Sequence, residues 1–279
     1  MLPDYLKISA AELGKDTNVK VTIKGDMASI AQAVADDMLA EILRAKEEGR
    51  NATFIIPVGP VDQFPILAKT LNEKNISIGD VCFINMDEYL TDADEWIPRE
   101  HPLSFRGYMD RLFYNLLDSS LAPKLVNRVF PDPKNYDAIQ ELIDARGGVD
   151  VCFGGIGING HIAFNEPPEP GETISNEAFI DLPTRNLTLT RETRTINSVT
   201  VGGEITLIPY RAVTVGMKEI LAAKRLRFYC NRPWQSAVVR RVLHGPITAN
   251  CPASFICNHP DAALTLADYV AASPNIQLR

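Results

Sequence analysis

The sequence lacks any long uncharged apolar run, although 46% of its 279 residues are hydrophobic. A membrane-spanning helix needs roughly 18 or more apolar residues in succession, so none is expected. Charged side chains interrupt residues 1–16, which lack the apolar core of a signal peptide. Basic runs are absent too, and the formal net charge is −7. We therefore expect a cytoplasmic protein that binds neither nucleic acid nor membranes. A small anionic substrate is still compatible with this composition, because a few local cations can suffice to bind it.

Cysteine and histidine are scarce and lack the spacing of disulfide or metal sites. The cysteines are odd in number and form no C-x-x-C pair, so reduced, mostly buried thiols are expected. The histidines include no pair at ligand spacing, and we expect no metal. These residues are Cys82, Cys152, Cys230, Cys251 and Cys257, with His101, His161, His244 and His259.

Strand-like and helix-like segments alternate along the chain, which is typical of βαβ units and predicts one α/β domain with a mostly parallel sheet. Strands are predicted at 19–23, 52–58, 81–86, 149–153, 212–215, 226–230 and 254–257. Helices are predicted at 27–48, where Asp26 can cap the first turn, and at 62–73, 104–117, 136–146, 235–244 and from about 260.

Two segments interrupt this alternation. Residues 91–102 are rich in proline and acidic side chains, and we expect them to form a lid or an interface. Between Pro167 and Pro209 the sequence is rich in Thr, Asn, Pro and Gly. Segments of this length inside a domain are usually functional covers or contain small irregular elements.

The glycine-rich turn at 154–167 is the most informative segment, because it presents His161 and Glu166 at the carboxyl end of a predicted strand, where open α/β sheets bind ligands. Gly155, Gly157 and Gly160 match the G-x-G-x-x-G pattern of dinucleotide sites, but that pattern requires a helix that starts at the glycines. The prolines at 167, 168 and 170 preclude a sustained helix, so neither NAD nor FAD is expected.

A single histidine on an apolar background is usually a structural residue. Here its neighbours favour chemistry instead. Asn159 lies two residues before it, and Asp87 and Glu88 follow another predicted strand.

Three motifs together resemble the glucosamine-6-phosphate deaminase (isomerase) family: N-M-D-E-Y at 85–89, H-P-x-S-F at 101–105 and G-x-N-G-H-I-A-F-N-E-P at 157–167. The resemblance covers most of the chain. The related 6-phosphogluconolactonases share the glycine-histidine turn but continue it as G-H-x-A-S, so F-N-E-P at 164–167 favours the deaminases. The resemblance implies an open Rossmann-like, mostly parallel sheet with helices on both faces and no cofactor. Some family members assemble into rings, so a homo-oligomer is compatible with it.

The resemblance also implies roles for individual residues. Asp87 matches the base that moves a proton between C2 and C1 of the open-chain sugar, and a carboxylate suits that task. His161 matches the residue that opens the sugar ring, with Glu166 as its carboxylate partner. Glu88, together with Gly157 and Gly160 of the turn, is expected to line the substrate site. The implied reaction converts an amino-sugar phosphate to a ketose phosphate and ammonia.

Asn159 stands where the family has an aspartate. A neutral amide can orient an imidazole but cannot stabilise an imidazolium by charge, and the comparable exchange in a serine-protease triad costs ~10⁴ in rate. Ring opening should therefore be impaired or handled differently.

The phosphate-binding loop departs as well. The family has a loop like S-G-G-T-P, whereas this chain reads V-G-P-V-D at 58–62 and keeps only Gly59. Pro60 removes an amide donor, and Asp62 places negative charge at a helix start that would otherwise attract an anion. Two further family cations are replaced, an arginine by Val199 and, in a less secure alignment, a lysine by Gln235.

Two explanations remain for these losses: either Arg194, Lys218 or Arg232 re-forms a phosphate site, or the substrate carries no phosphate there. The leading function is a sugar isomerase–deaminase. The alternatives are a non-catalytic protein that binds a sugar or sugar phosphate, and a lactone hydrolase.

Overall fold

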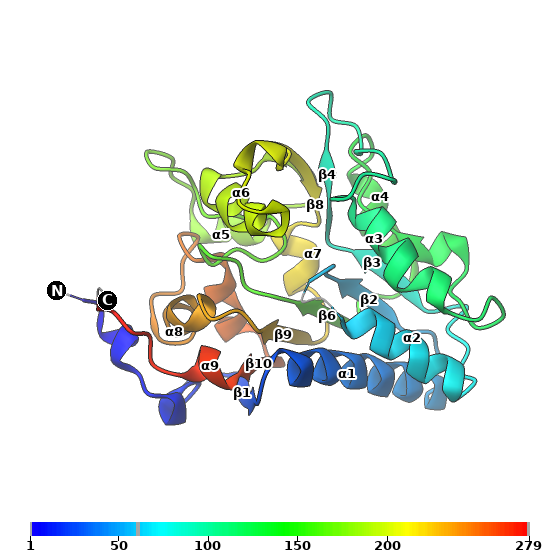
Figure 1. The fold of residues 1–279 in the computed structure, drawn as a ribbon, viewed down its shortest axis with the longest axis horizontal. Coiled ribbons are helices and arrows are strands. Elements are labelled where there is room, and N and C mark those ends of the chain that lie inside the picture. The colour runs from blue at the N-terminus through cyan, green and yellow to red at the C-terminus, as the bar shows by residue number, and fades with distance from the viewer. Residues whose placement is uncertain (1, 60–61, 278–279) are drawn as a thin grey trace.

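Seven strands form one parallel sheet in the computed structural model, which describes residues 2–59 and 62–277 (Figure 1). In spatial order they are β1 (Val19–Lys24), β10 (Ala262–Ala267), β9 (Leu226–Cys230), β6 (Val151–Gly154), β2 (Thr53–Ile56), β3 (Cys82–Asn85) and β5 (Arg128–Val129). Because all the pairings are parallel, the carboxyl ends of neighbouring strands share one edge. β6, β2 and β3 are consecutive at that edge.

A second, antiparallel sheet contains β4 (Asp87–Leu90), β8 (Arg211–Thr214) and β7 (Arg185–Thr188), in that spatial order. The chain passes from β3 into β4 through Met86, whose amide donates to Ile56 of β2 and whose carbonyl accepts from Val215. The strand predicted at 212–215 is thus observed, but in the smaller sheet. Asp87 lies at the point where the chain changes sheets.

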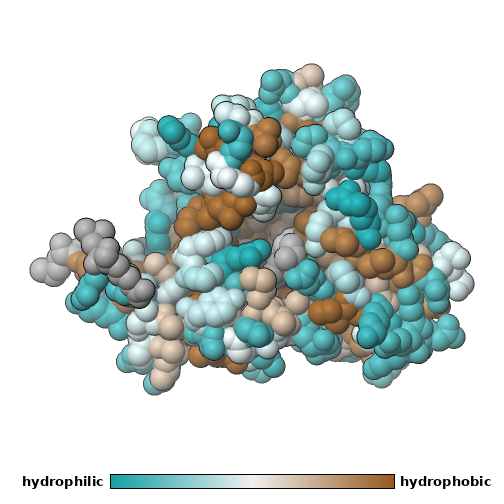
Figure 2. Space-filling model, viewed as in Figure 1, coloured by the Kyte–Doolittle hydropathy of each residue, from teal (hydrophilic) through white to brown (hydrophobic). Residues whose placement is uncertain are grey.

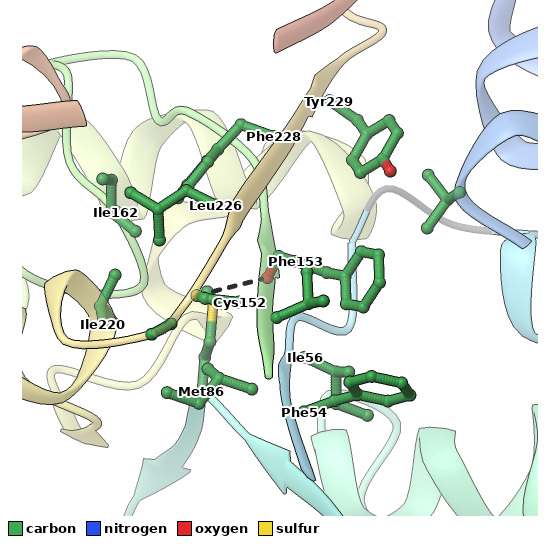
Figure 3. Close-up of a cluster of buried hydrophobic side chains, with 14 of the residues drawn as sticks. Phe54, Ile56, Met86, Cys152, Phe153, Ile162, Ile220, Leu226, Phe228 and Tyr229 are labelled. Atoms are coloured by element: carbon green, nitrogen blue, oxygen red, sulfur yellow. Dashed lines mark hydrogen bonds between the residues drawn. The ribbon is translucent and has the colours of Figure 1, made fainter. Parts of the chain in front are cut away.

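Helices cover both faces of the parallel sheet, as expected. Figure 3 shows Cys152 and Phe228 on one side of β6 and β9, together with Ile220 of α7 (Met217–Leu221). Phe153 and Tyr229 extend to the other side, where the Tyr229 hydroxyl donates to Asp37 of α1 (Met27–Glu47) at 2.5 Å. Alternate residues of these strands are therefore buried under different helices, which is why the strands read as continuous apolar runs.

The predicted helix starts are largely confirmed. Asp26 caps α1, since its carboxylate accepts from the Ser29 amide at 2.8 Å. The segment predicted at 104–117 divides into α3 (Phe105–Leu112) and a 3₁₀ turn at Tyr114–Leu116. The other helices of the described residues are α2 (Gln63–Glu73), α4 (Asp137–Ala145), α5 (Asn176–Ile180), α6 (Arg191–Asn197), α8 (Gln235–His244) and α9 (Asp268–Ala271).

Two predictions near the end of the chain were wrong, the strand at 254–257 and the helix from about 260. Residues 254–257, predicted as a strand, lie in a 3₁₀ helix (Pro252–Asn258), and β10 lies where the last helix was predicted. Leu264 and Leu266 are fully buried while Thr265 between them is half-buried, a period of two that the alanines around them masked. Up to residue 277, where the described residues end, α9 is the helix that follows this strand.

The long segment after Pro167 contains α5, β7, α6 and short 3₁₀ turns, so it is built of small elements. In the part of the chain that the structure describes, no helix combines the length and apolarity required to cross a bilayer.

Candidate active site

Asp87 begins β4 and lies opposite Thr214 of β8. Its side chain is 8% exposed. Burial, as the larger cause, and the neighbouring Glu88 carboxylate together raise the pKa of Asp87 to about 8. A buried carboxyl whose pKa lies near neutrality can accept a proton and return it.

Glu88 is fully buried and has a structural position. Its oxygens accept hydrogen bonds from the amides of Tyr89, Phe105 and Arg106, from the Ser104 hydroxyl and from Nε of Arg106, at 2.9 to 3.2 Å. The carboxylate therefore holds the N-terminus of α3, where negative charge is favoured. Because these hydrogen bonds already occupy the carboxylate, its surroundings differ from the substrate contact expected for Glu88.

The two glycines of the histidine turn are required sterically. A Cβ atom at Gly157 would overlap the His161 imidazole. Gly160 has φ +89°, and a Cβ atom there would lie 2.7 Å from Sγ of Cys251. The turn therefore wraps closely around His161 because these positions lack side chains.

Three oxygen atoms surround Nδ1 of His161. Asn159 Oδ1 lies at 2.8 Å, Thr193 Oγ1 at 3.3 Å and Glu166 Oε1 at 4.0 Å. The amide oxygen and the carboxylate can only accept, so they favour the tautomer with its proton on Nδ1, and Nε2 is left as an acceptor. Burial lowers the pKa of His161, and this effect outweighs the Glu166 carboxylate, which acts to raise that pKa. The ring is therefore kept neutral.

Glu166 joins the histidine turn to α6. Its Oε2 accepts from the Thr190 amide at 2.8 Å and its Oε1 from the Thr190 hydroxyl at 2.6 Å. Thr190 is the N-cap of α6 and accepts from the Thr193 amide at 3.3 Å. The sequence did not lead us to either threonine, although a threonine directly before a helix, such as Thr190, is a capping signal.

The structure brings Asp87 and His161 to the same region through Thr214. The Thr214 hydroxyl accepts from the Phe164 amide of the histidine turn at 3.0 Å, and Thr214 pairs with Asp87 across the antiparallel sheet. The Asn165 side chain adds a hydrogen bond to the Val215 carbonyl at 2.9 Å. Figure 2 shows a hollow at the centre of this face, between the part of the molecule that carries α6 and the part that carries α1 and α2.

Arg194, one of the cations considered for a phosphate site, is engaged elsewhere. The side chain is 6% exposed, and its guanidinium donates to the carbonyls of Ile205 and Ile208 at 3.2 and 3.4 Å and stacks 3.4 Å above the Tyr210 ring. These contacts fold the segment that follows α6 back onto the helix.

The other two candidates have different surroundings. Arg232 is half-buried with Nη1 3.9 Å from Sδ of Met27, at the start of α1. Gln235 accepts from the Arg232 amide at 2.7 Å and donates to the Ile156 carbonyl at 2.8 Å, so it supports the histidine turn. Lys218 is exposed on α7, which packs against α5.

The loop after β2 is described only at its two ends, because Pro60 and Val61 lie outside the described residues. Gly59 is exposed, with open space where a Cβ would be. Asp62 is also exposed, has φ +82° and directly precedes α2, and its carboxylate accepts no capping hydrogen bond within the described residues.

Known structures share this fold. The chain superposes on a monomeric glucosamine-6-phosphate deaminase with a TM-score of 0.78 and 25% identity, covering 92% of this chain and all of that one. The 6-phosphogluconolactonase from Trypanosoma cruzi has the same fold, with a TM-score of 0.64 and 15% identity over 91% of this chain and 96% of the other. The protein thus has the α/β fold common to these deaminases and lactonases.

Sequence comparison identifies the family. A scan against protein-family models finds no match. The chain is 31% identical over 262 residues to a glucosamine-6-phosphate deaminase of Beutenbergia cavernae, covering 91% of this chain and 92% of that protein. A deaminase of the same name from Bacteroides fragilis is 30% identical over 263 residues, or 91% of each chain. The chain belongs to the glucosamine-6-phosphate deaminase family.

Proposed function

We propose that this chain converts a 2-amino aldose to a ketose and ammonia. The observation that carries this proposal is the arrangement of His161. Its Nδ1 faces Asn159 and Glu166, so Nε2 is left as an acceptor. The turn that holds His161 is hydrogen-bonded to β8, the strand that pairs with Asp87. The relatives at about 30% identity carry the name of this activity.

Ring opening is the task of His161. Nε2 takes the proton from the anomeric hydroxyl and delivers it to the ring oxygen, so that the C1–O5 bond breaks and the aldehyde forms. Asn159 fixes the orientation of the imidazole through Nδ1. While His161 carries the transferred proton as an imidazolium, Glu166 at 4.0 Å is the negatively charged member of the group formed by Asn159, His161 and Glu166. Because Asn159 is neutral, this stage is less stabilised than with a second carboxylate.

Isomerisation is the task of Asp87. Its carboxylate removes the proton from C2, the electron pair forms the C1–C2 double bond of an enolamine, and the C1–O1 double bond opens as O1 takes up a proton from solvent. The proton on Asp87 exchanges with solvent before the carboxyl protonates C1, while the nitrogen electron pair forms a C2–N double bond and one N–H proton leaves to solvent. The C2 imine that results takes up one water and releases ammonia, which leaves the ketose. The raised pKa of Asp87 suits a group that must both bind and release a proton.

The test is turnover in deuterium oxide, which should place deuterium at C1 of the ketose as ammonia is released. Asp87→Asn should abolish both signals, because an amide cannot accept the C2 proton. Asp118→Asn, a matched change at an exposed carboxylate, should leave both intact. Full activity of Asp87→Asn would refute the assignment.

Asn159 favours one second candidate, a sugar-binding protein without turnover. In that case an amino sugar would raise the melting temperature of the protein while neither ammonia nor ketose was formed.

A further inference from the structure

We propose that the substrate carries no phosphate at the end remote from C1, and that the carboxylate of Asp62 binds a hydroxyl group there. This inference rests on the proposed function and narrows its substrate to an unphosphorylated amino sugar.

The position of Asp62 follows from the sheet order. β2 lies between β6 and β3, with Ile55 opposite both Cys152 and Ile84. The histidine turn follows β6, and Asp87 follows β3 by way of Met86. The connection from β2 to α2 therefore leaves the sheet between the two reacting groups, and Asp62 closes that connection at the start of α2.

The charge at this edge opposes a phosphate dianion. Asp62 and Glu166 contribute carboxylates, and Asp87 must also ionise to act as the base. A phosphate taken from water needs charge-assisted donors, and a carboxylate at a helix start cancels the attraction that the helix dipole would provide.

The three cations considered for a phosphate site lie away from the start of α2. Arg194 is buried against carbonyl groups and Tyr210. Arg232 follows β9, which β6 separates from β2, and its guanidinium lies beside Met27 at the start of α1. Lys218 lies on α7, whose neighbour is α5.

The local chemistry at the start of α2 suits a hydroxyl group. Asp62 has a left-handed backbone conformation that is uncommon for a residue with a side chain, and such conformations concentrate at functional sites. The next residue, Gln63, has a fully buried amide oxygen that receives no hydrogen bond within the described ranges. Both side chains present acceptors, which a sugar hydroxyl can satisfy and a phosphate dianion cannot.

The experiment compares glucosamine with glucosamine 6-phosphate as substrates of the full-length protein, by ammonia release. We expect kcat/KM to be at least tenfold higher for glucosamine. Asp62→Asn should lower that value about tenfold, because a charged acceptor is replaced by a neutral one, and asparagine tolerates the same backbone conformation. Asp16→Asn is the control, since Asp16 is also exposed with a positive φ of 62°, and it should change nothing.

A preference for glucosamine 6-phosphate, or an unchanged kcat/KM in Asp62→Asn, would overturn the inference. If neither sugar releases ammonia, the proposed function fails, and calorimetric titration of both sugars then tests the inference separately. Tighter binding of the phosphorylated sugar, or binding of neither, would overturn it there.

Discussion

Burial shifts the pKa values of the two groups that we propose as catalytic, Asp87 and His161, in opposite directions. It raises the pKa of the Asp87 carboxyl to about 8 and lowers the pKa of the His161 imidazole, because a low-dielectric site disfavours the charged form of each. Near neutral pH His161 is therefore a neutral base, whereas Asp87 is only partly ionised. The fraction of ionised Asp87 should limit the rate.

This difference predicts a pH dependence of activity. We expect kcat/KM for ammonia release to rise with pH and to reach half of its maximum near pH 8, since only ionised Asp87 can accept the C2 proton. A pH–rate profile measures it, and a rise with its midpoint near pH 4 to 5 would contradict the raised pKa.

The same residue affects stability. Asp87 ionises near 3.8 in the unfolded chain and near 8 in the folded one, so the folded state binds more protons between these values, and stability falls as pH rises through that range. Asp87→Asn removes this penalty. Its melting temperature should exceed that of the wild type by more at pH 9 than at pH 5.

At the scale of elements, two buried carboxylates hold helix starts beside the site. Glu88 receives the first amides of α3, and Glu166 receives the amide and hydroxyl of the residue that caps α6. Each carboxylate connects a short helix to the strand or turn that carries one of the proposed catalytic groups. The helices therefore position the site although they supply no acid or base to it.

Thr190→Val tests this coupling. The variant loses the hydroxyl contacts to Glu166 and to the Thr193 amide, which should cost about 1 kcal/mol as a lost cap and lower kcat roughly tenfold to a hundredfold through misplacement of Glu166. Ammonia release and urea unfolding measure the two effects. Ser175→Ala, which removes the N-cap of α5, should lose similar stability and keep kcat. Equal losses of kcat in both variants would show that Thr190 acts only through folding.

At the scale of the whole molecule, Arg240 ties distant parts of the chain together. It is fully buried in α8, and its guanidinium donates to the carbonyls of Ile8, Ser236 and Ala271 at 2.7, 2.9 and 2.7 Å. The segment before β1 and helix α9 both pack against α8 (Figure 1). One side chain thus satisfies carbonyls from three regions.

Arg240→Met should destabilise the protein by about 3 kcal/mol or more, because the carbonyls of Ile8 and Ala271 lose a charged donor that is otherwise buried. Arg241→Met, a change at the partly exposed neighbour with one contact to the Asn250 carbonyl, should cost about 1 kcal/mol or less. Urea unfolding distinguishes the two. Comparable costs would contradict the role of Arg240 as a connector.

The sequence by itself determined the α/β class, the bounds of α8 and the cap of α1, because hydrophobic period and capping chemistry are local. It also identified the family and the residues expected to react, since these occur in short contiguous motifs. Local patterns misplaced the strand at 262–267, whose small residues support helix and strand equally well.

Tertiary structure alone decided which polar side chains are left to act. Glu88, Arg194 and Gln235 have the chemistry of ligand-binding residues, but each is occupied by partners far from it in the chain, such as the Ser104 hydroxyl, the Ile208 carbonyl and the Ile156 carbonyl. Burial, which also depends on the packed molecule, raises the pKa of Asp87. A sequence names the donors and acceptors, whereas their pairing depends on distances that exist only in the folded chain.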